Sequence, residues 1–500
     1  MTATPPFRSL LVANRGEIAI RVIRACREMG IESVAVYSDA DAAALHVQLA
    51  DRAERIGPAT ASESYLSIPA VIEAARRSAA QAVHPGYGFL SENALFARAV
   101  EDAGLVFIGP PPATLEALGD KLAARHSVAA AGVPLVPGLL LPLEDGDTID
   151  LGEVGLPAML KAAAGGGGRG MRRIDTLEEL PAALAAARRE ARSAFGDGTI
   201  YVERLVSPAR HVEVQLLGDR HGTLACLGER ECSVQRRHQK LVEESPSPVV
   251  TPEIRAALFD SARRVAGTVD FHSAATVEFL LDPSGNHYFL EMNTRLQVEH
   301  GVTELVSGLD LVAWQIRIAA GEPLPQSVAE DQPRGHAIEV RLYAEDPYDG
   351  FRPVPGRVTA FSMPSGPGVR VDTGIQGDTD LPPHYDPLLA KLLVHAPDRA
   401  AAIARLRRAL DETLIGGVQT DHGFLRWLVD EPGFVEGNYD TGLVAERWDG
   451  AAPPGADDAA LAAFAASAAR AHSRPPNRRA VAEPDASAWS QLARREALNG

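Results

Sequence analysis

The sequence has 500 residues, too many for one hydrophobic core, and predicts roughly three or four lobes of typical domain size. Its 46% hydrophobic content is typical of a globular protein, and no apolar run approaches the ~20 residues of a membrane-spanning helix. A net charge of −17 argues against nucleic acid as a partner. Because a strand-like run begins already at Ser9, leaving no room for a targeting peptide, we expect a cytoplasmic protein.

The first 115 residues alternate between strands and helices. Strands are predicted at residues 10–13, 33–37, 81–83 and 106–108, which indicates an open parallel α/β sheet. The first strand-to-helix turn lacks the Gly-x-Gly-x-x-Gly pattern of dinucleotide-binding proteins. The stretch 84–89 follows the third strand, where such sheets bind ligands, and a plain turn is the alternative.

Four consecutive glycines lie between two strand-like segments: Gly165, Gly166, Gly167 and Gly168. A short strand and a helix follow, and Thr176 and Glu179 are expected to cap this helix, so the context fits neither a Rossmann turn nor a Walker A loop. We interpret the glycines as a flap whose backbone amides close over phosphates, with a surface linker as the alternative. The preceding strand carries Lys161, which places a positive charge beside the loop.

Arginine supplies most of the positive charge, and lysine occurs at only four positions: Lys121, Lys161, Lys240 and Lys391. Where arginine is used nearly everywhere, a lysine indicates that the position needs a compact ammonium group. For any single lysine, the alternative is that it occurs there by chance. The three cysteines have neither disulfide nor metal-ligand spacing, and we interpret Cys232 as a bystander thiol.

An antiparallel hairpin is predicted around a proline- and glycine-containing turn in the stretch 276–300. If Asp282 pairs with His287, the two acidic residues Glu278 and Glu291 lie directly opposite each other, a like-charge pairing that stability does not favour. Because side chains alternate along a strand, the Asn293 amide lies on the same face as Glu291. We therefore predict a Mg²⁺ site, with a solvated polar edge as the alternative, at Glu278, Glu291 and Asn293.

Several other segments carry polar side chains in unusual density. Predicted strands at 199–206 and 211–217 contain Glu203 and His211, and the donor-rich stretch 229–240 reads either as a solvated face or as cations that hold a phosphate. A third region begins near residue 335 with a strand that carries Arg341. It includes a helix at 399–413 with Asp398 as its N-cap, and from about residue 448 the chain is an Ala- and Pro-rich connector.

Six motifs together resemble the biotin carboxylase component of biotin-dependent acyl-CoA carboxylases, which belongs to the ATP-grasp superfamily. They lie at residues 13–18, 84–93, 119–121, 165–171, 235–240 and 291–300, and the resemblance covers roughly residues 8–445. It implies an ATP-grasp fold with an N-terminal open parallel α/β (Rossmann-like) domain, a mobile glycine-rich lid and a C-terminal β-rich domain. The implied boundaries are 1–115, 116–330 with the lid at about 136–205, 331–447, and a connector at 448–500.

The resemblance also implies a role for each matching residue. ATP would contact the four glycines of the flap together with Lys121, Lys161, Glu203, His211, Gln235 and His238. Mg²⁺ or Mn²⁺ would bind Glu278, Glu291 and Asn293. Bicarbonate would bind Lys240, Arg295, Gln297 and the Val298 backbone. Glu299 would act as the base, and biotin would contact Arg341 and Tyr87.

The implied reaction is the ATP-dependent carboxylation of biotin by bicarbonate through carboxyphosphate. The biotin would sit on a carrier domain, the partner would be a carboxyltransferase β-subunit, and we expect a homo-oligomer or a larger hetero-oligomer. No lysine follows Lys391, so the remaining sequence cannot carry biotin. The stretch 488–495 resembles the start of a connecting domain and indicates a fragment cut before its carrier, with a natural separate subunit as the alternative.

One departure from the family and two rival functions stay open at this point. Gly301 stands where the family usually has proline, which predicts a looser loop after Glu299. Another ATP-grasp ligase that joins a carboxylate to an amine would share much of the pattern. A catalytically silent assembly subunit is the other alternative, and the full set of charged site residues argues against it.

Overall fold

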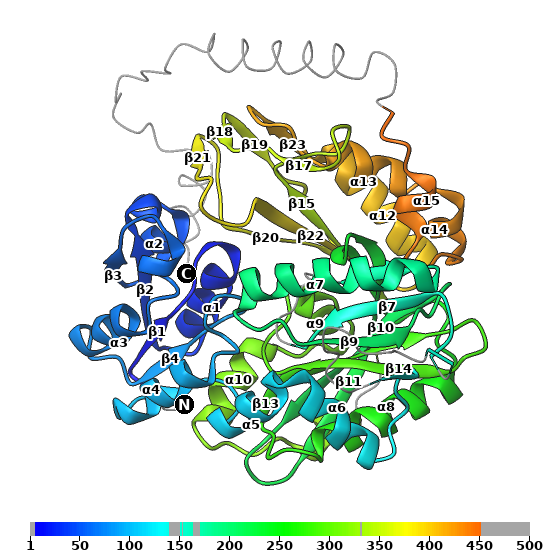
Figure 1. The fold of residues 1–500 in the computed structure, drawn as a ribbon. Helices are drawn as coiled ribbons and strands as arrows, with labels where there is room; N and C mark the ends of the chain where they lie inside the picture. The colour runs from blue at the N-terminus through cyan, green and yellow to red at the C-terminus, as the bar shows by residue number, and fades with distance from the viewer. Residues whose placement is uncertain (1–5, 140–150, 153, 164–170, 331–332, 452–500) are drawn as a thin grey trace, which may run out of the picture. The chain divides into compact units, whose positions relative to one another are not determined.

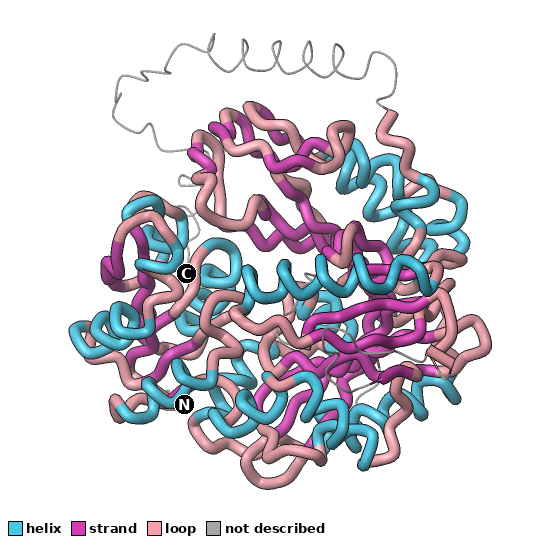
Figure 2. The backbone as a smooth tube through the Cα atoms, in the orientation of Figure 1, coloured by secondary structure: helices cyan, strands magenta, loops and turns pink. Residues whose placement is uncertain are grey.

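The computed structural model describes residues 6–139, 151–152, 154–163, 171–330 and 333–451 (Figure 1). All elements named below belong to one compact unit, Met1–Gly450. The glycine run at 165–168 and the predicted connector beyond residue 451 lie outside the described residues. In the described part, the larger sheets are flanked by helices (Figure 2).

The N-terminal sheet has five parallel strands in the order β3-β2-β1-β4-β5. Its strands are β1 (Ser9–Val12), β2 (Glu32–Ser38), β3 (Arg52–Gly57), β4 (Ala82–His84) and β5 (Val106–Phe107). Its helices are α1 (Gly16–Glu28), α2 (Leu45–Leu49), α3 (Ile68–Arg77) and α4 (Ala94–Asp102). Leu10 and Val12 pack in one core and Leu11 in another, so both faces of the sheet are buried, which explains the unbroken apolar strand. The predicted parallel sheet is confirmed, and β3 is an additional strand.

A smaller antiparallel sheet has the order β6-β9-β7-β8. Its strands are β6 (Gly138–Leu139), β7 (Ala158–Ala162), β8 (Arg172–Ile174) and β9 (Ile200–Arg204). Helix α7 (Leu180–Phe195) packs against it (Figure 1). The predicted cap of this helix is wrong, because the Thr176 side chain caps nothing and Glu179 instead accepts a hydrogen bond from the Asp175 amide. Glu179 is the last residue of a 3-10 turn, Leu177–Glu179, that lies between Thr176 and α7.

The central sheet has eight antiparallel strands in the order β14-β13-β10-β11-β12-β15-β22-β20. These are β10 (Arg210–Gly218), β11 (Leu224–Arg236), β12 (Gln239–Ser245), β13 (Ser273–Leu281), β14 (His287–Asn293), β15 (His336–Tyr343), β20 (Val369–Thr373) and β22 (Leu388–Ala396). The pairing of β12 with β15 continues the sheet across residue 331, where the sequence predicts a domain boundary. One sheet therefore carries residues from both predicted regions.

The remaining elements surround these sheets. The helices are α5 (Pro112–Gly119), α6 (Lys121–Ala130), α8 (Pro252–Ala266), α9 (His300–Ser307), α10 (Leu311–Ala319), α11 (Gln326–Glu330), α12 (Arg399–Glu412), α13 (His422–Leu428), α14 (Pro432–Glu436) and α15 (Leu443–Arg447). The short strand pairs are β16 (Glu345–Asp346) with β17 (Arg352–Pro353), β18 (Gly356–Val358) with β21 (Thr379–Leu381), and β19 (Ala360–Ser362) with β23 (Leu414–Gly416). The predicted N-cap of α12 is confirmed, because Asp398 accepts a hydrogen bond from the Ala401 amide.

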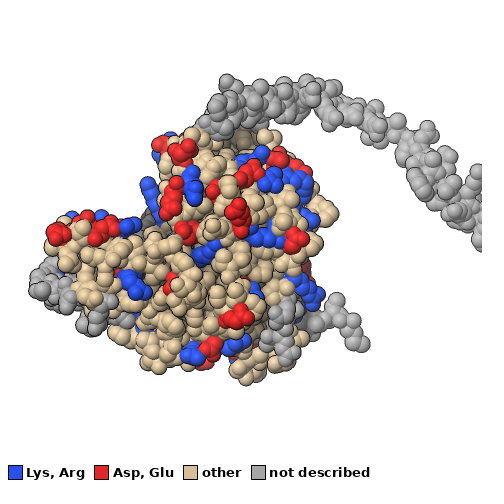
Figure 3. Space-filling model, turned by 90° about the vertical axis from the view of Figure 1, so that its right-hand side faces the viewer, with Lys and Arg blue, Asp and Glu red and all other residues tan. Residues whose placement is uncertain are grey.

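None of the described helices is long and apolar enough to cross a bilayer. Acidic and basic side chains are intermixed on the face drawn in Figure 3.

Gly301 does not lie in a loose loop, so that expectation is wrong. It is the second residue of helix α9 and is buried against strand β22. A Cβ atom added to Gly301 would lie 2.4 Å from Leu393 Cδ2, and Leu393 is itself fully buried. The position is therefore tightly packed, and a residue without a side chain fits it.

This packing predicts that Gly301→Ala destabilises the protein. Alanine is more favourable than glycine within a helix by ~1 kcal/mol. The steric overlap with Leu393 should outweigh this preference and lower the free energy of unfolding by about 1–2 kcal/mol. The matched control is Gly377→Ala, because a Cβ at Gly377 meets nothing within 4 Å. That control should stay within about 0.5 kcal/mol in urea unfolding, and equal effects at both sites would contradict the packing argument.

Candidate active site

One large cleft of about 1470 Å³ gathers the predicted site residues. It is lined by residues of the N-terminal sheet region, of the smaller antiparallel sheet and of the central sheet. All predicted site residues that the structure describes lie on its wall: Tyr87, Lys121, Lys161, Glu203, His211, Gln235, His238, Lys240, Glu278, Glu291, Asn293, Arg295, Gln297, Val298, Glu299 and Arg341. Residues more than 250 positions apart in the chain thus share one site.

The hairpin of β13 and β14 carries the two facing carboxylates. Glu278 pairs with Glu291, as predicted, but the predicted closing pair is wrong because His287 lies opposite Leu281. Asp282 belongs to the turn, where its carboxylate accepts hydrogen bonds from the backbone amides of residues 284 and 286, both at 2.9 Å. The register shift between the turn and Glu278 then restores the predicted pairing.

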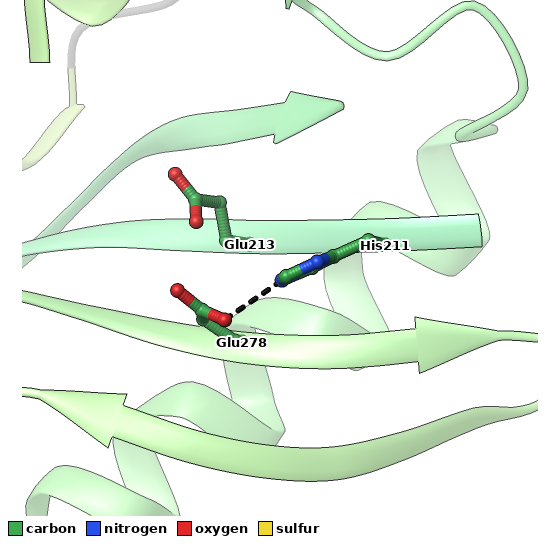
Figure 4. A group of neighbouring side chains, drawn as sticks. All are labelled: His211, Glu213 and Glu278. Carbon is green, nitrogen blue, oxygen red and sulfur yellow. Dashed lines mark hydrogen bonds and ion pairs between the residues drawn. The ribbon is translucent and has the colours of Figure 1, made fainter. Parts of the chain in front are cut away.

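The like charges of this pair are balanced by cations from other elements. Lys121 Nζ lies 3.1 Å from Glu291 Oε2, at the start of helix α6. His211 Nε2 lies 2.8 Å from Glu278 Oε2, and both side chains point to the same face of neighbouring strands (Figure 4). The Asn293 amide donates to Glu278 at 2.9 Å and to Glu291 at 3.3 Å, so it bridges the two carboxylates. Glu278 is buried, which rules out a solvated polar edge at this residue.

Lys240 lies at the centre of a group of three buried carboxylates. Its ammonium donates to Glu213 at 2.6 Å, to Glu278 at 2.9 Å and to Glu299 at 2.7 Å. Three N–H donors thus meet three acidic side chains. Burial by itself would lower the pKa of Lys240, but the three carboxylates outweigh it and raise this pKa well above its usual value. The residue is therefore a permanent cation at neutral pH.

Glu299 is held between two cations at the start of helix α9, where it is the N-cap residue. Besides Lys240, the guanidinium of Arg341 donates to its other oxygen at 3.0 Å. Burial raises the pKa of the Glu299 carboxyl, but Lys240, Arg341 and Arg230 together bring it well below its usual value. Arg341 also forms an ion pair with Glu243, whose pKa is raised to about 7 mainly by burial. Glu299 is consequently ionised.

Arg295 lies in the segment between strand β14 and helix α9. Its Nε donates to Glu92 at 2.8 Å, and one terminal nitrogen donates to the Gln297 side chain at 2.8 Å. Glu92 follows strand β4 of the N-terminal sheet, so this ion pair connects the central sheet to the N-terminal region. The planar guanidinium is therefore fixed in orientation at the cleft wall.

The part of the cleft near the smaller sheet holds the residues expected to contact the nucleotide. Glu203 is buried on β9, where Lys161 Nζ lies 2.6 Å away and Arg125 forms a second ion pair. His238 lies in the turn between β11 and β12 with a positive φ of 69°. Non-glycine residues rarely adopt this conformation, which is concentrated at functional sites. Burial raises the pKa of Cys232 well above its usual value, in agreement with a bystander thiol.

Sequence analysis did not single out several charged residues of this cleft and its wall: Glu92, Arg125, Glu213, Arg230 and Glu243. For Glu213 a signal exists, because it lies two residues after His211 on one strand and therefore on the same face. The other four come from elements remote in sequence from the motif residues they contact, and periodicity gives no information on such contacts.

The carboxylates of Glu278 and Glu291 and the amide of Asn293 fit a divalent cation. All three converge on one face of the hairpin, and hard cations such as Mg²⁺ prefer oxygen ligands of these types. A rotation of the Asn293 amide would present its oxygen instead of its nitrogen to the carboxylates. A cation there would take over part of the charge compensation that Lys121 and Lys240 provide.

Known families match almost the whole described chain. Residues 6–115 match the family described as biotin carboxylase, N-terminal domain, and residues 339–446 match the biotin carboxylase C-terminal domain. Residues 120–327 match the ATP binding domain of the carbamoyl-phosphate synthase L chain. A biotin carboxylase from Nostoc sp. is 49% identical over 442 residues, which cover 88% of this chain and 99% of the relative. The chain belongs to the biotin carboxylase family.

Other relatives of this biotin carboxylase support the same assignment. The propionyl-CoA carboxylase alpha chain of Ruegeria pomeroyi is 47% identical, over 88% of this chain and 68% of the relative. A biotin carboxylase structure from Campylobacter jejuni has a TM-score of 0.86 at 44% identity and covers 88% of this chain and 99% of its own. The biotin carboxylase domain of a Hydrogenobacter thermophilus 2-oxoglutarate carboxylase, in complex with MgADP, ADP and bicarbonate, has a TM-score of 0.84 at 44% identity, over 88% and 97% of the chains.

The predicted fold and activity are thereby confirmed. The protein has the ATP-grasp architecture with its N-terminal parallel sheet, and it is an ATP-dependent ligase that carboxylates biotin.

The charge balance in the cleft predicts different costs for removing two of its lysines. Lys240→Met leaves three buried carboxylates without their shared cation and should lower the free energy of unfolding by about 3–5 kcal/mol. Lys121→Met removes one ion pair between partly exposed groups and should cost about 1 kcal/mol or less. Urea unfolding of both variants measures the difference, and equal losses would contradict the central role of Lys240.

Proposed function

We propose that this chain performs the first half-reaction of an acyl-CoA carboxylase, in which bicarbonate is activated by ATP and the carboxyl group passes to a biotin on a carrier domain. The observation that carries the proposal is the position of Lys240. Its ammonium contacts Glu278, at the proposed metal pair, and Glu299, the proposed base, at 2.9 and 2.7 Å. The proposed metal site and the proposed base therefore both contact one side chain.

We assign phosphoryl transfer to the nucleotide end of the cleft. Lys121 and Lys161 would bind ATP phosphates, with Glu203, His211, Gln235 and His238 as further ATP contacts. Mg²⁺, held by Glu278, Glu291 and Asn293, would neutralise charge on the phosphates when bound. Because phosphoryl transfer depends on positioning and charge compensation, fixed cations at this end suit the step.

Bicarbonate would bind beside Glu299. Arg295 offers a planar guanidinium that matches a flat anion, and the Lys240 ammonium, the Gln297 side chain and the Val298 amide would complete the site. Glu299 is ionised and can accept the bicarbonate proton, although its low pKa makes it a weak base. An anion bound beside it shares Lys240 and raises the pKa of Glu299, so its basicity would increase as bicarbonate binds.

Arg341 would stabilise the negative charge that develops on the ureido oxygen of biotin. Burial opposes its charge, but Glu243, Tyr343 and Glu299 raise its pKa well above the usual value, so the guanidinium stays positive. Tyr87 would contact biotin from the N-terminal region. Its hydroxyl donates a hydrogen bond to Glu17, which fixes the ring at the cleft wall.

The family also supports the partners that the sequence predicts. Relatives named as alpha chains extend beyond the matched region, since the match covers 68% of the Ruegeria protein and 62% of the mouse methylcrotonoyl-CoA carboxylase subunit alpha. We infer that the carrier domain and a carboxyltransferase β-subunit are the partners of this chain, in a homo-oligomer or a larger hetero-oligomer. We place this assembly in the cytoplasm.

The reaction can be tested with purified protein and free biotin. ATP hydrolysis should depend on bicarbonate and Mg²⁺ and should increase when biotin is added, because carboxyphosphate forms only when bicarbonate is present. Release of inorganic phosphate measures the rate. Stimulation by an amine substrate instead of bicarbonate would identify a carboxylate–amine ligase, and no hydrolysis under any condition would identify a silent subunit.

The proposed base predicts a selective loss in Glu299→Gln. This variant keeps the shape of the side chain but cannot accept a proton, so bicarbonate-dependent hydrolysis should fall by about 10²–10⁴-fold while the Kd for ATP stays within about twofold. Glu231→Gln is the matched control, because Glu231 is equally buried, on strand β11, and does not line the cleft. A rate for Glu299→Gln equal to that of the control would contradict the assignment.

A further inference from the structure

Lys391 differs from the other three lysines of the chain. Lys121, Lys161 and Lys240 line the cleft, whereas Lys391 lies on strand β22 with 0% of its side chain exposed. Its strand neighbours are Arg341 on β15 and Asp372 on β20. Because direct cross-strand partners point to the same face of a sheet, the Lys391 side chain lies beside that of Arg341.

The Lys391 ammonium is surrounded by groups from distant parts of the chain. It donates a hydrogen bond to the Val298 carbonyl oxygen at 2.6 Å, and it lies 3.4 Å from Glu17 Oε1 and 3.7 Å from Asp372 Oδ2. Burial would lower the pKa of Lys391, but Glu17, Glu339 and Asp372 raise it above its usual value. The group is thus a cation that reaches one carbonyl and two carboxylates.

The Val298 carbonyl belongs to the peptide bond that joins Val298 to Glu299. Strand β14 ends at Asn293 and helix α9 begins at His300, so residues 294–299 lie outside both elements. The orientation of this segment depends on its contacts, since no strand or helix hydrogen-bond pattern fixes it. A donor on the Val298 carbonyl fixes the plane of the Val298–Glu299 peptide, and with it the position from which the Glu299 side chain leaves the backbone.

The second contact of Lys391 leads to the opposite wall of the cleft. Glu17, at the start of helix α1, accepts a hydrogen bond from the Tyr87 hydroxyl. Lys391 is therefore connected to the proposed bicarbonate segment through Val298 and to a proposed biotin contact through Glu17. These connections join the central sheet to the N-terminal region.

We propose that Lys391 is a positioning residue for the carboxylation reaction, which holds the Val298–Glu299 peptide in the orientation that binds bicarbonate. This inference rests on the proposed function, in which Val298 and Glu299 belong to the bicarbonate site. It also explains why lysine stands here in an arginine-rich chain. A compact ammonium donates to the Val298 carbonyl and lies within ion-pair distance of Glu17 and Asp372, whereas a planar guanidinium is longer and spreads its donors in one plane.

The test uses the double variant Lys391→Met with Asp372→Asn. The Lys391→Met change removes the hydrogen-bond donor of the Val298 carbonyl. The Asp372→Asn change removes the negative charge that would otherwise lose its lysine partner. We expect the KM for bicarbonate in ATP hydrolysis to rise at least tenfold, kcat to fall, and the KM for ATP to stay within twofold. A role in folding alone would lower thermal stability without this difference between the two KM values.

The matched control is the double variant Arg399→Met with Glu244→Gln. It removes the ion pair between Glu244, which is buried on strand β12, and Arg399, which is partly exposed at the start of helix α12, with contacts of 2.7 and 3.0 Å. Neither residue lines the cleft. Its KM for bicarbonate should stay within twofold of the unchanged protein. An equal KM for bicarbonate in both double variants would overturn the role of Lys391.

Asp372→Asn alone decides the question if the double variant does not fold. It keeps the size of the side chain and weakens the attraction of residue 372 for the Lys391 ammonium, together with its ion pair to Arg370. A two- to fivefold rise in the KM for bicarbonate is expected, and an unchanged KM would overturn the proposal. The unchanged protein distinguishes a failure of the proposed function from a failure of the role of Lys391. If its ATP hydrolysis does not respond to bicarbonate, the proposed function fails, whereas a normal response with unaffected variants refutes only the role of Lys391.

Discussion

The active site depends on one electrostatic constraint: several carboxylates are buried together and need a shared cation. Glu213, Glu278 and Glu299 all contact the Lys240 ammonium, and each of them is almost fully removed from solvent. Removing charges from water is costly unless opposite charges and hydrogen bonds compensate for it. A cluster of this kind does little for stability by itself, and its position in a cleft is what relates it to chemistry.

The central sheet provides the geometry for this cluster. Direct cross-strand pairs align Glu291 with Glu278, Glu278 with Glu213, and Glu213 with Arg230, so four neighbouring strands present charges on one face. Further along, β12 pairs with β15, which brings Arg341 from the C-terminal region to within 3.0 Å of Glu299. Because the sheet is continuous, the proposed metal residues of the hairpin and the proposed biotin contact Arg341 lie on the same sheet.

Local patterns predicted much of this arrangement. The alternation of side chains along a strand was sufficient to pair Glu278 with Glu291 and to place Asn293 on the same face, because these relations extend over few residues. Local reasoning failed where a side chain had a choice of backbone partners. Asp282 bonded to amides of its own turn and left the strand, and Glu179 bonded to Asp175 rather than completing a cap with Thr176.

The sequence by itself determined the family, the residue types of the candidate site and the pairing of Glu278 with Glu291, because motifs and strand periodicity are local properties. Only the tertiary structure decided which distant groups contact the site residues. Arg125 pairs with Glu203, Glu92 pairs with Arg295, and Lys391 donates to the Val298 carbonyl. These partners are set by the order of strands in the sheets and by the packing between them. Burial makes the partners of Glu203 and Lys391 obligatory, since an uncompensated polar group inside the protein costs far more than one at the surface.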